Sequence, residues 1–429
     1  MRLDQLTLTN FRCYKDKTFN FHPNVNLIVG QNATGKTAIL DAITIAMGTW
    51  LLGFNKKTDS QNILKSDATN HYVERNGSSF FIEQWPVTIS AQGHVNNQSI
   101  QWQRTKGSAT GTTRHGQSIE LIELAKQAND ELITTIDLPL ISYYGTMRLW
   151  HDPKRAKTQP NLHKKDKPSR LDGYKFSVDP RISVKTLVQW FAKQEWQAFK
   201  EKQIPTMLAV VRKAVLANIE NAKALEYDAE REELLLTIAG NDPQPFSLLS
   251  DGQRSLLALV ADIAQKAITL NPHLGEKTLE LTQGIVLIDE LDLHLHPRWQ
   301  RSVIENLRTI FPKIQFICTT HSPFLIQSLR SSEELIMLDG EPSAAVNNKS
   351  LEDIAVGIMS VNQPQVSQRY EAMKSKAIEY LAKLQKTEQL PSEKLEQYKQ
   401  DLADSIAPYA DNPAYQAFLE MHRVAKLGG

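Results

Sequence analysis

The 429-residue sequence predicts an α/β fold in which buried strands alternate with helices. Three segments carry this prediction. An apolar run at residues 25–29 leads into GQNATGKT, residues 30–37, and a helical pattern follows as far as residue 50. A second apolar run, GIVLI at residues 284–288, ends in two acidic residues. A third segment, LSDGQRS at residues 249–255, opens a long helical pattern.

Composition and charge agree with a globular chain that can bury a large core. Hydrophobic residues make up 41% and charged residues 23%, both ordinary values for such proteins. The 49 basic and 48 acidic residues give a net charge of +1, so any nucleic-acid surface must be a local patch. Cys13 and Cys318, both in apolar strand-like runs, argue against a disulfide framework. Neither a signal peptide nor an 18-residue apolar run is evident, and we expect a cytoplasmic protein.

The first 150 residues are expected to form an N-terminal lobe with the phosphate loop, as we call residues 30–37. An alternating pattern predicts edge strands at 3–9 and 17–21 and a hairpin of 85–92 with 98–105. Residues 51–84 are polar and weakly patterned, which predicts irregular structure. Residues 118–133 are expected to form a helix and 138–144 a buried strand.

Residues 151–248 are expected to form a basic loop followed by a helical insertion. The loop, 151–175, carries eight lysines or arginines and three aspartates, and is either a DNA-contacting surface or a solvated insertion. The segment 181–225 is strongly helical, and an apolar face is expected there from Trp190, Phe191, Trp196 and Phe199. A strand pair at 225–228 and 233–239 closes this part.

Residues 249–345 are expected to complete the α/β core, with a helix at 297–310 and a strand at 314–319. The remainder, 346–429, contains charged helical stretches at 366–387 and 392–403, which predict a helical hairpin. This C-terminal region is either a docking surface for a partner or a surface for self-association or capping of the core.

The phosphate loop fits the pattern G-x-x-x-x-G-K-[ST] and lies between a strand and a helix. Gly30 and Gly35 permit backbone angles that side chains forbid, so successive N–H groups can wrap a phosphate at a helix N-terminus. Lys36 is expected to reach the β- and γ-phosphates of ATP, and the Thr37 hydroxyl to bind Mg²⁺. Asn32 and Ala38 complete the nucleotide-binding residues expected at this loop.

The run GIVLIDE delivers two carboxylates beside the phosphate loop. Asp289 is expected to hold Mg²⁺, and Glu290 to polarise the attacking water.

The signature segment, as we call Leu249–Ser255, offers a second anion-binding helix end. Ser250 is a plausible N-cap, and the N–H of Gly252, with Gln253 beside it, can bind a phosphate. Two such ends but one nucleotide loop indicate that the signature segment serves a nucleotide held by a second subunit.

His321 follows the strand FICTT. It either contacts the γ-phosphate or has a structural role, and spacing alone favours the structural role. The pair His294 and His296 lacks further ligands nearby, which favours a structural role over a metal site.

Together, GQNATGKT, LSDGQ, GIVLIDE, DLHLHP and THS resemble the ABC-type ATPases of the SMC, RecF and OLD group over about residues 1–340. The resemblance implies a two-lobed head with an antiparallel β subdomain, which sandwiches two ATP molecules between antiparallel protomers. It implies that LSDGQ acts in trans and that Asp292 lies at the dimer seam. It also implies that His321 is a switch histidine and that Arg12 contacts a nucleotide phosphate. The glutamine expected in SYYGTMRLW, residues 142–150, has no counterpart, and Thr146 or a water is expected to replace it.

Within that group, YYGTMRLW, SRLDGY, DPRIS and IDELDLHLHPRWQ are similar to the PtuA family, the ATPases of Septu-type anti-phage systems, some relatives of which accompany retrons. The similarity implies slow ATP hydrolysis, oligomerisation and control of a separate HNH nuclease of the PtuB kind. No nuclease motif is evident in the chain itself. A DNA-repair clamp ATPase of the RecF/SMC kind is the alternative. A transporter ATPase is disfavoured, because Gly30 and Ser250 are farther apart than in that family.

Overall fold

The computed structural model describes residues 1–54, 60–75, 78–128, 136–149, 169–339, 349–359, 361, 367–386, 417 and 421. The chain divides into two compact units, Met1–Ile354 and Ala355–Gly429. The first unit contains the strands, so the predicted α/β class is confirmed. Most of the predicted basic loop and the helical stretch 392–403 lie outside the described residues.

The strands of the first unit are β1 (Arg2–Phe11), β2 (Tyr14–Asn20), β3 (Val25–Val29), β4 (Asn70–Arg75), β5 (Ser78–Glu83), β6 (Val87–Val95), β7 (Gln98–Lys106), β8 (Thr113–Arg114), β9 (Leu140–Tyr144), β10 (Ala222–Asp228), β11 (Glu233–Ile238), β12 (Gln244–Pro245), β13 (Gly284–Ile288), β14 (Ile314–Thr319) and β15 (Leu335–Met337). The α-helices are α1 (Lys36–Leu51), α2 (Ile119–Ala128), α3 (Val184–Glu201), α4 (Thr206–Asn218), α5 (Asp251–Leu270), α6 (Thr278–Leu281), α7 (Pro297–Gln300), α8 (Val303–Ile310), α9 (Pro323–Gln327), α10 (Leu351–Gly357) and, in the second unit, α11 (Gln368–Lys386).

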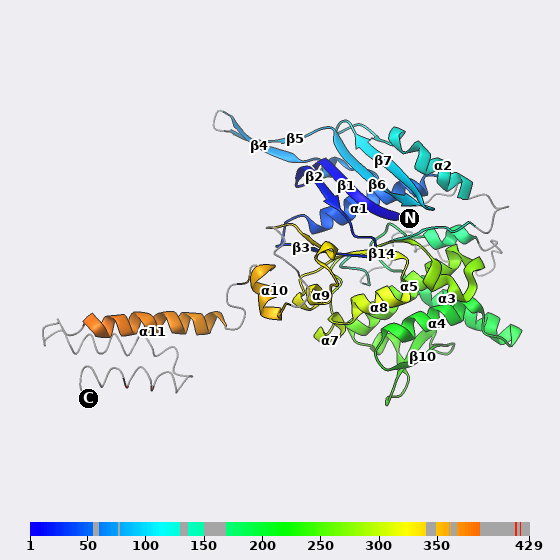
Figure 1. Ribbon diagram of the computed structural model, residues 1–429. Coiled ribbons are helices and arrows are strands. Elements are labelled where there is room, and N and C mark those ends of the chain that lie inside the picture. The colour runs from blue at the N-terminus through cyan, green and yellow to red at the C-terminus, as the bar shows by residue number, and fades with distance from the viewer. Residues whose placement is uncertain are drawn as a thin grey trace. The chain divides into compact units, whose positions relative to one another are not determined.

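A parallel five-stranded sheet forms the centre of the first unit, with the strand order β15-β3-β14-β13-β9 (Figure 1). Every residue of β3, β9, β13 and β14 is buried. Parallel strands are covered on both faces, which is why these segments read as continuous apolar runs.

A second, antiparallel sheet has the order β2-β1-β6-β7-β8, and helix α1 lies between it and the parallel sheet (Figure 1). Of the 16 residues of α1, 14 are buried, as expected of a helix that is apolar on all sides. The indole of Trp102 on β7 donates a hydrogen bond to Ala46 O at 3.0 Å. The helix that follows the phosphate loop is therefore held by both sheets.

The predicted hairpin is confirmed in β6 and β7, which are joined by Asn96 and Asn97. Both asparagines have positive φ angles, 49° and 67°, as the tight two-residue turns of hairpins require.

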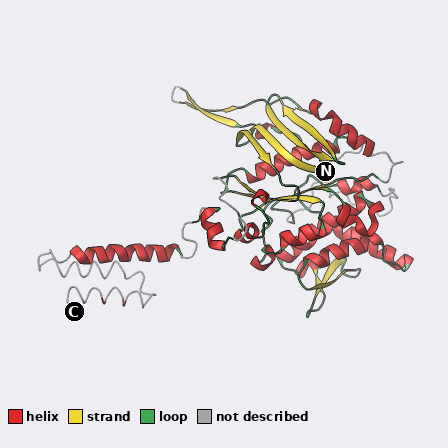
Figure 2. Ribbon diagram, viewed as in Figure 1, coloured by secondary structure: helices red, strands yellow, loops and turns green. Residues whose placement is uncertain are grey.

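A layer of helices, mainly α3, α4, α5 and α8, lies on the other side of the parallel sheet (Figure 2). The apolar face predicted for 181–225 is wrong in part. Phe191 is fully buried, but Trp196 and Phe199 are 67% and 77% exposed and stack on each other. Residues five apart on a helix lie about 140° apart, so Phe191 and Trp196 cannot share one face.

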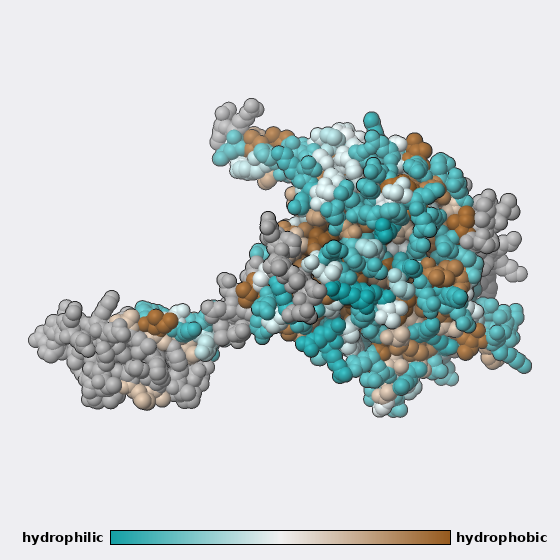
Figure 3. Space-filling model, in the orientation of Figure 1, coloured by the Kyte–Doolittle hydropathy of each residue, from teal (hydrophilic) through white to brown (hydrophobic). Residues whose placement is uncertain are grey.

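The prediction of irregular structure for 51–84 is also wrong in part, because β4 and β5 form a hairpin there. Tyr72, Phe80, Phe81 and Ile82 on this hairpin are each at least 50% exposed, and Figure 3 shows the apolar colour on it. Both faces carry apolar side chains, so the sequence lacks the one-sided alternation of a half-buried strand. The helix predicted at 297–310 is two helices, α7 and α8, with a break at Arg301 and Ser302.

Cys13 lies in the tight turn between β1 and β2 and is exposed, whereas Cys318 is buried in β14; neither forms a disulfide. Among the described residues, we find no helix with the length and apolar character that a membrane crossing requires.

Candidate functional site

The carboxyl ends of the parallel strands meet at one edge of the sheet. Gly30 follows β3, Gly145 follows β9 and Asp289 follows β13. Thr320 follows β14, and Asp339 comes just after β15. Ligands of α/β proteins bind outside this edge. The sequence motifs are therefore brought together by the sheet itself.

The phosphate loop is packed tightly against the turn between β1 and β2. Gly35 has φ 98°, and a Cβ there would lie 2.5 Å from the sulfur of Cys13 and 2.7 Å from the hydroxyl of Tyr14. Tyr14 also donates a hydrogen bond to Thr34 O at 3.1 Å. Both the backbone angle and the available space therefore require glycine at this position.

Lys36, the first residue of α1, is held within the loop. Its ammonium donates hydrogen bonds to Gly30 O at 2.7 Å and Gln31 O at 2.9 Å. Burial lowers the pKa of Lys36, and the nearby carboxylates, Asp289 first among them, oppose that shift. A bound phosphate would add a further negative charge beside the ammonium and so favour its protonated form. Asp339 accepts a hydrogen bond from Gln31 N at 2.7 Å, which fixes the first turn of the loop.

Asp289 joins the phosphate loop to two strands. The residue is 5% exposed, and its Oδ2 accepts a hydrogen bond from the Thr37 hydroxyl at 3.1 Å. Its Oδ1 accepts a hydrogen bond from the hydroxyl of Thr319, the last residue of β14, at 2.5 Å.

The pair of Thr37 and Asp289 fits Mg²⁺, which prefers one or two protein oxygens together with water and substrate phosphate. Within the described part of the chain, no group of three or more His, Cys, Asp or Glu has the arrangement of a protein-only metal site. A Mg²⁺ ion bound together with a nucleotide takes its remaining ligands from phosphate and water, so two protein oxygens suffice for it.

Glu290 leaves the strand with an unusual backbone. Its φ is 48°, a left-handed angle that is uncommon for a residue with a side chain. Its N–H donates a hydrogen bond to the hydroxyl of Thr319 at 2.8 Å. Thr319 thus contacts both the predicted Mg²⁺ ligand, through the carboxylate of Asp289, and the predicted general base, through the backbone of Glu290.

Arg148 is a residue that sequence reasoning missed. It follows β9, close to the place where a glutamine was expected, and is 3% exposed. Its guanidinium donates hydrogen bonds to Asp289 O at 3.0 Å and Glu290 O at 3.3 Å, and its Nε to the Ser255 hydroxyl at 2.9 Å. Thr146, the proposed substitute, is half-buried. The only signal in the sequence was one arginine between Met147 and Leu149, in a stretch with no other charged residue.

The signature segment begins α5, and the predicted N-cap is confirmed. The hydroxyl of Ser250 accepts a hydrogen bond from Gln253 N at 3.4 Å, and the Gln253 side chain accepts one from Ser250 N at 3.0 Å. A Cβ on Gly252 would lie 2.5 Å from His294 O, so this glycine allows α5 to approach the loop after β13. Among the described residues, no hydrogen bond joins Ser250, Gly252 or Gln253 to the phosphate loop of the same chain.

Asp292 and the segment around His321 are tied together. Asp292 accepts a hydrogen bond from the Thr320 hydroxyl at 2.5 Å, and Ser322 donates one to the side chain of Gln300 at 2.7 Å. His321 lies between two buried neighbours and is itself half-buried, beside the carboxyl end of β14. His296 caps α7 by accepting a hydrogen bond from Arg298 N at 3.3 Å, which gives it a structural role.

Arg12 contacts two carboxylates. Its guanidinium donates hydrogen bonds to Asp41 at 2.5 Å and Asp67 at 2.9 Å. Burial alone would lower the Arg12 pKa, but the two carboxylates outweigh burial and raise it. These bonds use Nε and Nη1, and a guanidinium has five N–H donors, so the two carboxylates do not by themselves exclude a phosphate contact by Arg12. Of the remaining predicted residues, Asn32 is exposed in the loop and Ala38 is buried in α1.

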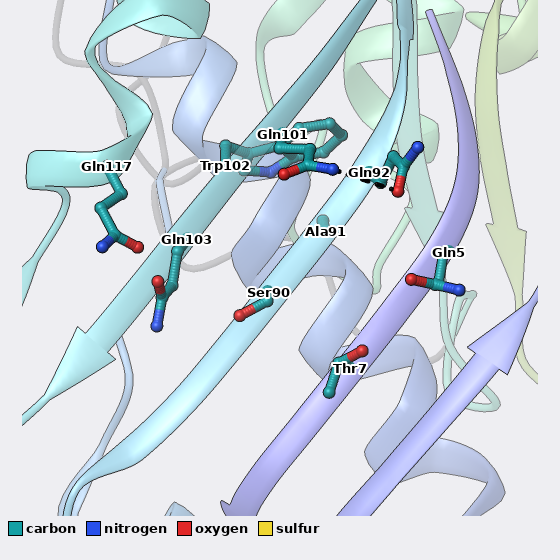
Figure 4. Close-up of a pocket in the computed structure, with 9 residues that line it drawn as sticks. All are labelled: Gln5, Thr7, Ser90, Ala91, Gln92, Gln101, Trp102, Gln103 and Gln117. Carbon is teal, nitrogen blue, oxygen red and sulfur yellow. Dashed lines mark hydrogen bonds between the residues drawn. The ribbon is translucent and has the colours of Figure 1, made fainter.

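A shallow depression of about 380 Å³ lies on the antiparallel sheet, away from these motifs (Figure 4). Glutamines dominate its lining, namely Gln5, Gln92, Gln101, Gln103 and Gln117. Its lining contains neither an acid nor a base, so the depression offers no cation to pair with a phosphate and no general base for hydrolysis.

The chain is similar to one protein family and to several relatives. Residues 5–239, more than half of the chain, match the AAA domain family AAA_23. The retron Vc95 probable ATPase of Vibrio cholerae serotype O1 biovar El Tor is 25% identical over 386 residues, covering 78% of this chain and 73% of that protein. The Septu protein PtuA of Bacillus thuringiensis is 25% identical over 350 residues, covering 79% of this chain and 76% of that protein.

Among solved structures, an SMC head bound to the C-winged helix domain of ScpA aligns with a TM-score of 0.48 and 15% identity, covering 79% of this chain and 94% of that one.

Proposed function

We propose that this chain, an ATPase that belongs to the AAA domain family AAA_23, closes ATP between two copies of itself and so controls a separate nuclease in anti-phage defence. The observation that carries the proposal is the contact of Thr37 with Asp289, which places the end of the phosphate loop on the first carboxylate after β13. ATP hydrolysis needs these two groups adjacent.

Each side chain at the strand ends has a defined task in this proposal. Lys36 binds the β- and γ-phosphates, and Thr37 with Asp289 would hold Mg²⁺. When bound, Mg²⁺ neutralises the charge of the phosphate oxygens. Glu290 orients and polarises the attacking water as the general base. His321, half-buried beside the same edge, senses the γ-phosphate.

The second copy supplies the signature segment. The start of α5 offers the N–H of Gly252 and the partial positive charge of a helix N-terminus, both suited to a phosphate. Within one chain these groups have no hydrogen bond to the phosphate loop among the described residues. A head-to-tail pair brings each signature segment to the nucleotide of the other chain, with Asp292 at the seam.

The role in defence is proposed from the PtuA and retron ATPase relatives. Residues 1–150 and 249–345 would form the ATPase, 151–248 an insertion whose basic loop contacts DNA, and 346–429 the docking region for an HNH nuclease of the PtuB kind. Two free cysteines suit a reducing, cytoplasmic setting. A RecF/SMC-like DNA-repair clamp is the alternative.

The ATPase cycle is tested with Glu290→Gln. We expect this variant to bind ATP and accumulate as a pair in sedimentation analysis, because the general base is lost while every phosphate contact remains. The double variant Lys36→Ala, Glu290→Gln is the control and should stay unpaired. Wild-type hydrolysis rates in Glu290→Gln would refute the assignment of the base.

The nuclease partner is tested by truncation after residue 350. The full chain is expected to co-purify with an HNH protein encoded beside it, and the truncated chain to lose that protein while keeping ATP binding. A truncated chain that retains the nuclease would refute the docking role. A membrane permease gene in place of the nuclease gene would refute the defence role.

A further inference from the structure

We propose that Arg148 is a positioning residue that couples the signature helix α5 to the catalytic carboxylate Glu290 of the same chain. The inference rests on the proposed function, since it gives a path by which one nucleotide site of a pair influences the other.

One end of the path is the backbone around the catalytic acids. Arg148 Nη1 donates hydrogen bonds to Asp289 O at 3.0 Å and to Gly145 O at 3.2 Å, and Nη2 donates to Glu290 O at 3.3 Å. The carbonyls of both acids are thus held by one guanidinium. Because Glu290 has a left-handed φ of 48°, its backbone depends on such contacts to keep its conformation.

The other end is the signature helix. Arg148 Nε donates a hydrogen bond at 2.9 Å to the hydroxyl of Ser255, which is 4% exposed. Ser255 lies five residues after Ser250, so it is in the second turn of α5. A shift of the helix start therefore reaches Arg148 directly, through one buried side chain.

Helix α5 is anchored farther along, which makes its first turns the part that responds. Asp262 forms an ion pair with Lys266 at 2.8 Å and accepts a hydrogen bond from the Tyr144 hydroxyl at 2.7 Å. Tyr144 is the last residue of β9, four residues before Arg148. The helix is fixed to the strand at this point, while its N-terminus lies at the surface with Ser250 exposed.

The chemistry of the guanidinium suits this task. Arg148 makes four hydrogen bonds to one hydroxyl and three carbonyls, whereas a glutamine side chain has only two N–H groups to donate. Burial lowers the pKa of Arg148 to about 10, which leaves it protonated at neutral pH. A neutral amide at this position could not hold both acids and the helix at once.

In a head-to-tail pair, the nucleotide that Ser250 meets belongs to the partner chain. Its binding or release moves the start of α5, and Arg148 passes that movement to Glu290. Hydrolysis at the two sites is therefore linked, and the ATPase rate of the full-length protein depends cooperatively on ATP concentration.

The test uses Ser255→Ala, which removes the helix end of the link and leaves the bonds of Arg148 to the carbonyls. Ser142→Ala is the matched control, because Ser142 is also buried and accepts a 3.4 Å hydrogen bond from Lys266 of α5. We expect Ser255→Ala to lower kcat about tenfold. Its Hill coefficient for ATP falls to about one, the value for independent sites. Its Kd for a fluorescent ATP analogue stays within about twofold. Ser142→Ala keeps the wild-type values.

Arg148→Lys provides a second arm, since it keeps the buried cation but cannot bridge the hydroxyl and the carbonyls together. We expect the same loss of cooperativity, with nucleotide binding retained. If Ser255→Ala and Arg148→Lys both pair on ATP and hydrolyse it with wild-type kcat and Hill coefficient, the coupling is refuted and the proposed function stands. If the wild type itself does not pair on ATP, the proposed function fails, and the coupling with it.

Discussion

Replacement of Thr319 by valine removes one hydroxyl and keeps the shape of the side chain. That hydroxyl donates to Asp289 Oδ1 at 2.5 Å and accepts from Glu290 N at 2.8 Å. Thr319 is fully buried at the end of β14, so no water replaces the lost bonds without rearrangement. The substitution therefore removes one hydrogen bond from each of the two acids, Asp289 and Glu290, and leaves both residues unchanged.

The expected magnitude follows from the two bonds. A hydrogen bond to a charged group contributes about 1.5–3 kcal/mol, and a buried N–H left without a partner costs about 1–3 kcal/mol. Since about 1.4 kcal/mol corresponds to a factor of ten, even one of these losses felt in the transition state lowers kcat about tenfold or more. Thr319→Ser loses only a methyl group, about 1 kcal/mol of stability, and keeps both bonds.

The assay is steady-state ATP hydrolysis at saturating Mg²⁺ and ATP, with a urea unfolding curve for each variant. We expect Thr319→Val to fall at least about tenfold in kcat below Thr319→Ser and to unfold at lower urea. Equal rates for the two variants would show that this hydroxyl does not position the two acids. A drop in stability alone would show that the bonds are structural and not catalytic.

Two further predictions concern the start of α5 and a buried hydrogen bond at the far end of α1. Gly252→Ala places a Cβ 2.5 Å from His294 O, so the start of α5 must shift. We expect kcat to fall with little change in the Kd for ATP. Gly116→Ala is the control: a Cβ there meets nothing within 4 Å, so kcat and Kd should keep their wild-type values. Wild-type kcat in Gly252→Ala would contradict this. Tyr174→Phe leaves the Trp50 indole N–H, now 2.9 Å from the tyrosine hydroxyl, without its partner, and we expect a loss of about 1–3 kcal/mol in urea unfolding followed by tryptophan fluorescence. An unchanged midpoint would show that this buried bond contributes nothing.

The predictions that the structure confirms concern contiguous segments. The runs 25–29 and 284–288 are continuous and apolar because both faces of a parallel strand are covered, and each ends at the residue that the motif marks. The Ser250 cap was predictable because a capping box needs only residues three apart. Such patterns are local, so a single sequence suffices to read them.

Features that depend on distant contacts were not predictable. Arg148 takes its role from its hydrogen bonds to Ser255, Asp289 and Glu290, which lie 107, 141 and 142 residues farther along the chain. The residues next to Arg148 in the sequence do not indicate these partners. The bonds of Arg12 to Asp41 and Asp67 likewise depend on how the end of β1 lies against α1 and against the turn at 65–67. Gly252 of the signature segment was predicted to bind a nucleotide. The fold gives a second reason for glycine at this position, because the helix backbone there lies close to His294 O.

If each nucleotide site is made from two chains, two inactive variants should restore activity when they are mixed. Lys36→Ala removes the phosphate-loop half and Ser250→Arg the signature half, so each variant alone should lack ATPase activity. In an equimolar mixture, half of random pairs contain one of each, and one site of such a pair is intact. We expect activity to reappear in the mixture, up to roughly a quarter of the wild-type rate if the intact site works alone and less if the two sites are linked. A mixture as inactive as its components, or full activity of Ser250→Arg alone, would contradict it.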